Sequence, residues 1–195
     1  MLTENRQRKI ESVVANRQSG LVLVLEDIHD PHNAQAILRT CDAFGIQNVY
    51  FIFDQEKSYN PKKVGQVTSS SANKWLDFHI FKSTPSCLQS LKKQGFKIYA
   101  TILDEKAKAL DQIKFCDKKI AIMLGNEHRG LSAKAIKLAD QAIYIPMKGM
   151  VQSLNVSVTA AIMIFEASRQ RNKIDSKNRL SPREQKKLIK DFSQR

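Results

Sequence analysis

Continuous apolar runs alternate along the chain with segments in which apolar residues recur every three or four positions. Residues 21–25 and 120–124 are apolar throughout, a pattern typical of strands buried on both faces of a parallel sheet. The intervening spacing is that of amphipathic helices. Strands are predicted at 21–25, 49–53, 75–81, 96–103, 120–124 and 142–145. Together these elements predict an α/β fold with a largely parallel sheet, in which the less continuous run 75–81 lies nearer an edge.

The helix predictions depend on caps and breakers as much as on periodicity. Thr3 is a predicted N-cap, and Gly20 is expected to close the first helix. Ser181 with Glu184 three residues later forms a capping box, and Pro182 suits the first helical position. Polar residues 54–74 predict a loop with one or two short helices that faces RNA. Helices are predicted at 3–18, 34–44, 85–94, 132–138, 156–167 and 182–192.

The segment from Ile145 to Arg171 combines a strand end, a polar loop and a long apolar helix. Pro146 cannot donate a ladder hydrogen bond and therefore suits the strand end. Ser153 or Asn155 is predicted to cap the helix that follows. Free N–H groups and the helix dipole favour a polar or anionic ligand at such a helix start, so a binding site is expected here.

Positive charge is concentrated at the two ends of this 195-residue chain. Residues 168–195 hold ten Lys and Arg against three acidic residues, and residues 1–20 hold four against two. The ends thus contribute +9 of the net charge of +13, leaving a nearly balanced core. Basic helices that flank such a core favour binding to a polyanion, and nucleic acid is the expected partner.

The remaining composition predicts a cytoplasmic protein of one domain with extensions. The first ten residues are polar and charged, unlike a signal peptide, and the apolar run 156–165 is too short to span a membrane. Three widely spaced cysteines predict neither a disulfide framework nor a zinc site. Cys41 lies on the apolar face of its predicted helix, so packing is its expected role.

The sequence contains neither of two familiar nucleotide-binding motifs in complete form. Residues 125–132 follow a buried strand as a phosphate-binding loop would, but Leu131 stands where that motif requires lysine. An NTPase is therefore not expected, and no G-x-G-x-x-G motif for a dinucleotide is present. Four potential metal ligands, two Asp and two His, gather in the segment 27–32. An ordinary strand-to-helix turn is the favoured interpretation, and no metal is expected there.

Three polar clusters follow the carboxyl ends of apolar strands, where ligands bind in open α/β sheets. The clusters therefore predict one pocket with hydrogen-bonding groups for a hydroxyl or ribose, and with Arg39 for a phosphate. Asn33 and Arg39 are six residues apart and do not share a helical face, so Asn33 either acts from the helix start or is only a cap. The clusters are Asn33 with Arg39, Glu127 with Arg129, and Ser153 with Asn155.

The three clusters lie within motifs of a known family. Residues 33–45 (NAQAILRTCDAFG), 124–132 (LGNEHRGLS) and 145–161 (IPMKGMVQSLNVSVTAA) resemble the three motifs of the SpoU, or TrmH, class of RNA ribose 2′-O-methyltransferases. The third motif is most similar to that of the branch that methylates guanosine 18 of tRNA. The resemblance spans residues 21–170, which suggests an N-terminal basic helix at 1–20, a methyltransferase domain at 21–170 and a basic helical extension at 171–195.

The resemblance implies a trefoil-knotted SPOUT-type α/β fold, an S-adenosylmethionine pocket formed by the knotted loops, and a homodimer with sites at its interface. Carried over residue by residue, it makes Arg39 the catalytic arginine, helped by the residues that shape the ribose and phosphate site: Asn33, Glu127, Ser153 and Asn155. The cofactor is expected to contact a second set, largely through backbone groups: Thr101, Gly125, Ile145 and Leu154. His128 and Arg129 depart from any fixed pattern in the second motif.

The implied reaction is displacement at a sulfonium methyl by a ribose 2′-oxygen, which needs alignment and loss of one proton but no metal. A free guanidinium has a pKa above about 12, so Arg39 is better suited to holding a phosphate than to acting as a general base. Two alternatives remain open on sequence alone: a ribosomal RNA methyltransferase, and an RNA-binding module without catalysis. The proton acceptor and the tRNAs accepted also remain open.

Overall fold

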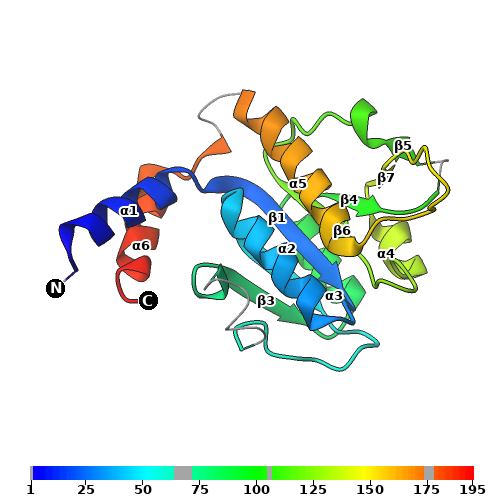
Figure 1. Ribbon diagram of the computed structural model, residues 1–195, viewed down its shortest axis with the longest axis horizontal. Coiled ribbons are helices and arrows are strands. Elements are labelled where there is room, and N and C mark those ends of the chain that lie inside the picture. Colours follow the sequence, from blue (N-terminus) through cyan, green and yellow to red (C-terminus); the bar gives the residue numbers. More distant parts are fainter. Residues whose placement is uncertain (1, 64–71, 105–106, 174–177) are drawn as a thin grey trace.

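A computed structural model describes residues 2–63, 72–104, 107–173 and 178–195. Its centre is a seven-stranded sheet in the order β3-β2-β1-β6-β4-β7-β5, and every strand pair is parallel (Figure 1). The parallel α/β class predicted from the sequence is therefore confirmed, with β3 at an edge. The strands are β1 (Gln18–Glu26), β2 (Ile46–Ile52), β3 (Asp77–Phe81), β4 (Lys97–Thr101), β5 (Lys108–Ala109), β6 (Ile120–Leu124) and β7 (Gln141–Tyr144).

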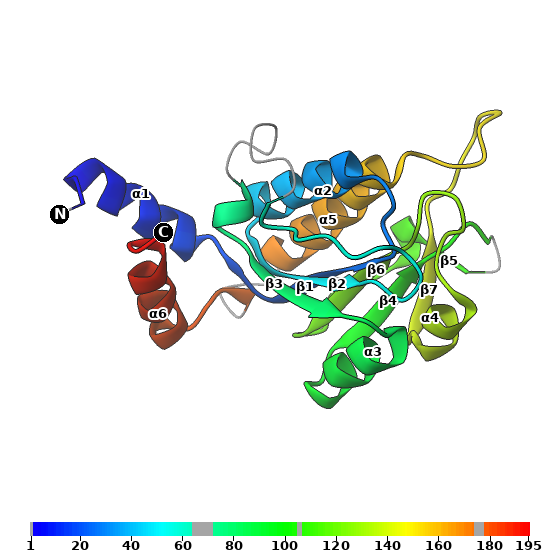
Figure 2. The ribbon, with the colours of Figure 1, turned by 90° about the horizontal axis from the view of Figure 1, so that it is seen from below.

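Helices cover both faces of this sheet. Figure 2 shows α2 and α5 on one face and α3 and α4 on the other, which gives three layers. The short strand β5 and the 3-10 turn Leu110–Gln112 were not predicted; the 3-10 turn Ala72–Lys74 falls within the segment 54–74, whose residues 64–71 lie outside the described residues. The helices are α1 (Glu4–Ala15), α2 (Pro31–Ala43), α3 (Thr84–Lys93), α4 (Ala133–Leu138), α5 (Val156–Lys173) and α6 (Pro182–Phe192).

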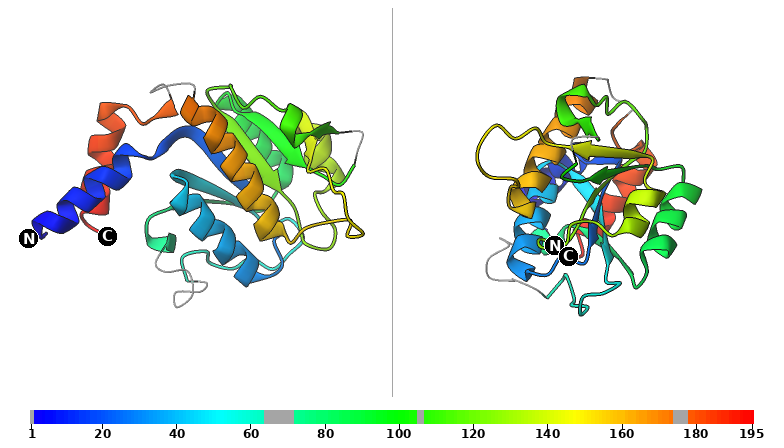
Figure 3. Two further views of the ribbon diagram at one scale, coloured as in Figure 1. Left: turned by 45° about the horizontal axis from the view of Figure 1, so that its top comes forward. Right: turned by 90° about the vertical axis from the view of Figure 1, so that its right-hand side faces the viewer.

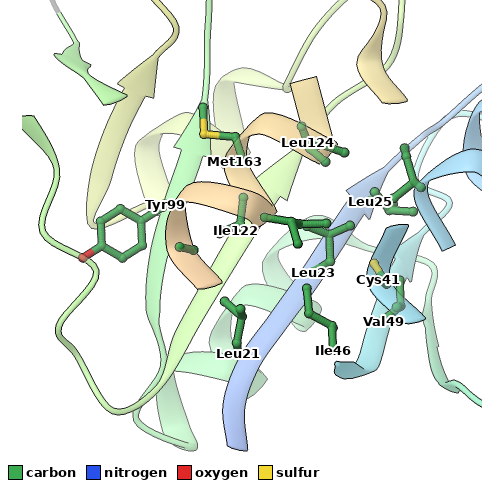
Figure 4. Packing of buried hydrophobic residues seen from close by; sticks show 14 of the residues in the cluster. Leu21, Leu23, Leu25, Cys41, Ile46, Val49, Tyr99, Ile122, Leu124 and Met163 are labelled. Atoms are coloured by element: carbon green, nitrogen blue, oxygen red, sulfur yellow. The ribbon is translucent and has the colours of Figure 1, made fainter. Parts of the chain in front are cut away.

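The continuous apolar runs are explained by this layering. Successive side chains of β1 point to opposite faces of the sheet, and helices shield both faces from water. Leu23 belongs to the core beneath α2 and α5, together with Cys41 and Met163, whereas its neighbour Val24 packs with Leu88 of α3 on the other face (Figure 4). Cys41 is fully buried, and desolvation by that burial raises the pKa of its thiol far above the ordinary value, in accord with a packing role.

Gly20 corrects one sequence-based boundary. The first helix ends at Ala15, and Gly20 lies inside β1 with a φ of 72° instead of closing that helix. A β-carbon at this position would overlap the carbonyl oxygen of Lys118. Glycine is therefore required here for close backbone contact within the sheet, and not for a helix end. The predicted caps Thr3 and Ser181 are both confirmed, the latter with its complete capping box.

The two terminal helices form one unit beside the sheet. Ile10 and Val14 of α1 pack with Phe192 of α6, and both chain ends project together from the domain (Figure 1). Trp75, just before β3, holds this unit through a ring contact of 5.0 Å with Phe192. Arg195 adds a 2.6 Å ion pair to Asp77 at the start of β3. The basic helices are thus fixed to the domain, although the sequence suggested two separate extensions.

The end of α5 belongs to the core as much as to any extension. Arg171 is fully buried, and its guanidinium donates to the carbonyl oxygen of Asp117 at 2.8 Å and to the side chain of Gln18 at 3.3 Å. A cut at residue 171 would therefore remove a buried cation and leave acceptors unsatisfied. The division of the chain at residues 20 and 170 stays a prediction, and so does the trefoil knot. No helix in the described ranges is long and apolar enough to cross a bilayer.

Candidate ribose and cofactor site

The predicted site lies where the order of the strands reverses. Strands β1 and β6 are neighbours, with Leu25 in register with Leu124. After β1 the chain enters α2, which carries the first polar cluster, and after β6 it enters the loop that carries the second. Crevices at such switch points, outside the carboxyl ends of the strands, are the usual ligand sites of open α/β sheets. Helix α5 begins beside this edge, since it packs along α2 (Figure 3).

One hydrogen-bonded chain links the three predicted clusters. Glu127 accepts a hydrogen bond of 2.9 Å from the side-chain amide of Asn33, and the oxygen of that amide accepts one of 3.0 Å from Asn155. Glu127 also accepts from the backbone N–H groups of His29 and Asp30, at 2.9 and 3.1 Å. The structure therefore brings together Glu127, Asn33 and Asn155 from segments that are far apart in the sequence.

Glu127 is held in its ionised form. Partial burial alone would raise the pKa of its carboxyl group. The hydrogen bonds from Asn33 and from the backbone N–H groups of His29 and Asp30 outweigh that effect and place the pKa below the ordinary value. The result is a fixed carboxylate at the start of α2, where the positive end of the helix also favours it.

The structure decides between the two candidate caps of α5. Asn155 accepts hydrogen bonds from the backbone N–H of Ser157 at 2.7 Å and from its hydroxyl at 2.6 Å, as an N-cap does. Ser153 is exposed and makes no side-chain hydrogen bond with the described residues. For α2 the cap is Asp30, whose carboxylate accepts from His32 N–H at 2.8 Å. Asn33 is therefore free to join the cluster from the first turn.

Arg39 lies apart from this cluster. It is six residues beyond Asn33 on α2, about 9 Å farther along the helix axis, and its side chain is exposed. Within the described part of the chain it makes no hydrogen bond or ion pair. The acid nearest to it on the helix, Asp42, is held by the buried Arg17 at 2.6 Å. Arg39 is thus available to a ligand, and its predicted catalytic role stays a prediction.

The residues predicted to bind the cofactor follow three adjacent strands. Thr101 ends β4, Gly125 follows β6 and Ile145 follows β7, and these strands lie side by side in the order β6-β4-β7. The hydroxyl of Thr101 donates to the carbonyl of Met123 at 2.9 Å and so joins two of the strands. Leu154, half-buried, immediately precedes the cap of α5. The fold therefore gathers these four residues at or beyond the carboxyl ends of the strands. Their contact with a cofactor stays a prediction.

Gly125 starts a closed loop, unlike a phosphate-binding loop. Asn126 and Gly130 exchange backbone hydrogen bonds of 3.1 and 2.9 Å, so the loop folds back on itself. A β-carbon on Gly125 would overlap the backbone of Gly130 and Leu131. This close approach of the two backbone segments explains why glycine is needed at position 125. The predicted turn at 27–32 is also present, and no group of three metal-ligating side chains occurs among the described residues.

Three further residues organise the site and were missed in the sequence. Asp27 adopts a φ of 52°, and its carboxylate accepts N–H groups of the segment 54–56 at 2.9 to 3.2 Å. Asn126 donates to the carbonyl of Asp27 at 2.7 Å. Glu56 accepts from Arg129 at 2.7 Å and lies 3.1 Å from the ring of His29. The only sign of these roles in the sequence was that Asp and Asn tolerate left-handed backbone, and this sign is weak.

Fold and site together define a class of protein: a doubly covered parallel α/β domain with a polar site at the switch point, suited to a hydroxylated ligand. The chain belongs to the SpoU methylase family, since the sequence model of the "SpoU rRNA Methylase family" matches residues 20–165.

Relatives with assigned activities cover most of the chain. The tRNA (guanosine(18)-2′-O)-methyltransferase of Thermus thermophilus is 42% identical over 97% of this chain and 96% of its own length. The enzyme of the same name from Escherichia coli K12 is 35% identical over 87% of this chain and 72% of its own length. The crystal structure of the Aquifex aeolicus TrmH/SpoU tRNA modifying enzyme matches with a TM-score of 0.85 at 31% identity, covering 98% and 96% of the two chains.

Proposed function

We propose that the protein transfers a methyl group from S-adenosylmethionine to the ribose 2′-hydroxyl of guanosine 18 in tRNA. The observation that carries this proposal is the hydrogen-bonded chain Asn155–Asn33–Glu127, which unites three motifs at the switch point. The similarity to tRNA (guanosine(18)-2′-O)-methyltransferases from three bacteria, over 87% or more of this chain, supports it. A cytoplasmic location, where tRNA is found, is part of the proposal.

The side chains of the site would position the ribose rather than activate it strongly. The cofactor, when bound, supplies a methyl group on a sulfonium sulfur. The 2′-oxygen would accept that methyl group, and the hydroxyl proton would leave to water or to the adjacent phosphate. Asn33, Asn155 and the carboxylate of Glu127 offer donors and acceptors for the ribose hydroxyls at a fixed geometry. Ser153, exposed two residues before the cap, would contact the same nucleotide.

Arg39 would hold the phosphate beside the reacting ribose. Its guanidinium is always charged and can grip a phosphate with two parallel hydrogen bonds. The described residues leave that guanidinium unpaired, so no internal ion pair must be broken when RNA binds. The same charge would stabilise the alkoxide that develops on the 2′-oxygen.

The edge formed by Thr101, Gly125, Ile145 and Leu154 fits an S-adenosyl group in its chemistry. Exposed apolar side chains follow two of these strands: Leu103, two residues after Thr101, is 75% exposed, and Met150, in the loop after β7, is 100% exposed. Uncovered apolar residues in loops that follow a row of strand ends suit an adenine ring and its ribose.

A homodimer is part of the proposal. Val158 and Phe165 are seven residues apart on one face of α5, and they are 45% and 54% exposed. Exposed apolar side chains on one face of a helix favour a protein interface. A dimer made across α5 would bring a second copy close to the exposed loop 145–155 of the first, and light scattering measures the mass of the assembly directly.

We expect methyl transfer to a tRNA transcript that carries guanosine at position 18, and none when that residue is 2′-deoxyguanosine. The deoxy transcript removes only the attacking oxygen, so it is a matched control for binding. Incubation with labelled S-adenosylmethionine measures the transfer. Label in ribosomal RNA alone would indicate the ribosomal alternative, and label in neither RNA would indicate a binding module.

Binding of the cofactor can be tested on the same purified protein separately from catalysis. S-adenosylhomocysteine at a hundredfold excess over its dissociation constant should stabilise the fold by about 2.7 kcal/mol, seen as a raised melting temperature. ATP should leave the melting temperature unchanged, because position 131 lacks the lysine of a phosphate-binding loop.

We expect the exposed lysines of α6 to set the salt dependence of tRNA binding. Replacing Lys186, Lys187 and Lys190 by glutamine should reduce the slope of log affinity against log salt by about 0.7 to 0.9 for each lysine–phosphate ion pair removed. These positions are preferable to deletion from residue 171, because Arg171 and Phe192 are buried. Filter binding over a range of salt concentrations measures the slope. An unchanged slope would mean that α6 only supports the fold.

A further inference from the structure

A second polar cluster adjoins the ribose site and is not used by the proposed chemistry. It comprises Glu56, Arg129 and His29, here called the rim cluster. The carboxylate of Glu56 accepts from the guanidinium of Arg129 at 2.7 Å and lies 3.1 Å from Nδ1 of His29. The side chains of Arg129 and His29 are 51% and 61% exposed, so a ligand can reach both.

The rim cluster is physically continuous with the ribose site. The backbone N–H of His29 donates to Glu127 at 2.9 Å, while its ring faces Glu56. Arg129 is only two residues beyond Glu127, so their Cα atoms can be no more than about 7 Å apart. A base is bonded directly to its ribose. A nucleotide whose ribose lies at Glu127 therefore has its base within reach of the rim cluster.

A hollow adjoins the rim cluster at Arg129. It has a volume of about 290 Å³, and Arg129 lines it together with Asp27, Gln55 and Asn126, whereas Glu56 and His29 do not. This is near the lower limit of small-molecule pockets. The rings of His29 and His128, which belong to the two loops around the hollow, lie 6.0 Å apart in an edge-on arrangement. Histidine rings and arginine planes are common stacking surfaces for unstacked bases of RNA.

We propose that the rim cluster reads the guanine base of the target nucleotide, with Arg129 donating to O6 and Glu56 accepting from N1–H and the N2 amino group. This inference rests on the proposed function, in which guanosine is the substrate. Guanine offers an acceptor at O6 beside donors at N1 and N2, and it can enter between a guanidinium and a carboxylate. Adenine offers a donor at N6 and an acceptor at N1, so both side chains would meet a like group.

A purely structural role for Glu56 is the competing explanation. Glu56 joins the loops 27–30 and 125–131, since it also lies 3.4 Å from the side-chain amide of Asn126. A structural staple would affect every RNA substrate to the same extent. A group that reads the base would affect only those substrates whose base carries the matching atom. The two roles therefore differ in the ratio of rates between substrates, and not in the rates themselves.

The test uses tRNA transcripts that differ in a few atoms of the base at position 18. Inosine is guanosine without the N2 amino group, and 2-aminopurine lacks O6 and the hydrogen on N1. Wild-type protein should have a kcat/KM roughly tenfold lower for inosine than for guanosine, the range expected when one hydrogen bond to the base is missing. Glu56→Ala should bring the guanosine to inosine ratio close to one. Glu56→Gln, which keeps one acceptor oxygen and a similar shape, should give an intermediate ratio.

Arg129→Ala should show the complementary pattern. It should leave the guanosine to inosine ratio unchanged and bring the guanosine to 2-aminopurine ratio closer to one, because guanine O6 then loses the hydrogen bond that 2-aminopurine cannot form. Lys134→Ala is the matched control: Lys134 is an exposed cation near the same loop, 3.9 Å from Asp54, and its removal should change neither ratio.

The outcomes separate this inference from the proposed function. Ratios in Glu56→Ala and Arg129→Ala equal to those of the wild type would overturn the reading of the base, while methylation itself would stand. A wild-type enzyme that methylates guanosine and inosine equally well would overturn it too. Absence of methylation of all transcripts by the wild type would remove the proposed function, and the inference with it.

Discussion

Replacing Arg39 by alanine is expected to remove nearly all methyl transfer and to leave the fold unchanged. Arg39 is exposed, and none of the described residues is bonded to its side chain, so its truncation removes no internal interaction. If the guanidinium holds the phosphate and stabilises the developing alkoxide, its removal should lower the rate by about 10²- to 10³-fold, as for other donors to a developing oxyanion. The effect should appear in turnover more than in tRNA affinity.

Single-turnover methylation at saturating tRNA and cofactor measures this effect. Arg39→Lys keeps the cation but not the planar fork, and we expect it to restore little activity. Lys93→Ala removes an exposed cation from α3, on the opposite face of the sheet, and should leave the rate unchanged. A near-normal rate for Arg39→Ala would exclude both the phosphate-holding mechanism and the choice of this residue.

Replacing Glu127 by alanine is expected to reduce methyl transfer by about 100-fold, because a shift of about 1 Å at a reacting group can cost that much. Asn33 and the backbone N–H groups of His29 and Asp30 would all be left without their common acceptor. The amide of Asn33 would then be free to turn, and its bond to Asn155 would no longer be fixed from both sides. The melting temperature should fall only slightly, because water can reach the carboxyl ends of the strands and hydrogen-bond to the groups that lose their acceptor.

Glu127→Gln separates the charge of the carboxylate from its shape. The amide retains one acceptor oxygen but places an NH2 group against a donor, so activity should lie between those of the wild type and Glu127→Ala. Glu11→Gln on α1 is a control, since that exposed glutamate lies far from the site in the sequence and accepts only from Gln7 among the described side chains. Wild-type activity in Glu127→Ala would contradict a role in holding the ribose.

The pH dependence of stability has a definite sign at this residue. The pKa of Glu127 is below its ordinary value of 4.5 in the folded protein, so ionised Glu127 stabilises the fold above that pH. This contribution should be lost as the pH falls through the lowered folded pKa. The difference in unfolding free energy between wild type and Glu127→Gln should therefore be constant above about pH 5 and should shrink below about pH 4.5. Denaturant titrations at several pH values measure that difference.

The fold class and most of the helices and strands could be predicted from the pattern of apolar residues and caps alone. Strands buried on both faces must be apolar at every position, so the run 120–124 was recognised with its observed bounds. Caps are local interactions, so Thr3 and Ser181 were also readable from a few neighbouring residues. Gly20 was misread because a glycine that ends a helix and one that allows close backbone contact look alike in sequence.

Only the tertiary structure decided which polar residues meet. Asn33 is 94 residues from Glu127 and 122 residues from Asn155 along the chain, and it is the adjacency of β1 and β6 and the packing of α5 on α2 that joins them. The buried cations Arg17 and Arg171, and the joining of α1 with α6, were equally hidden. A charged residue looks exposed in a sequence, because what makes its burial possible is a set of partners that are distant along the chain.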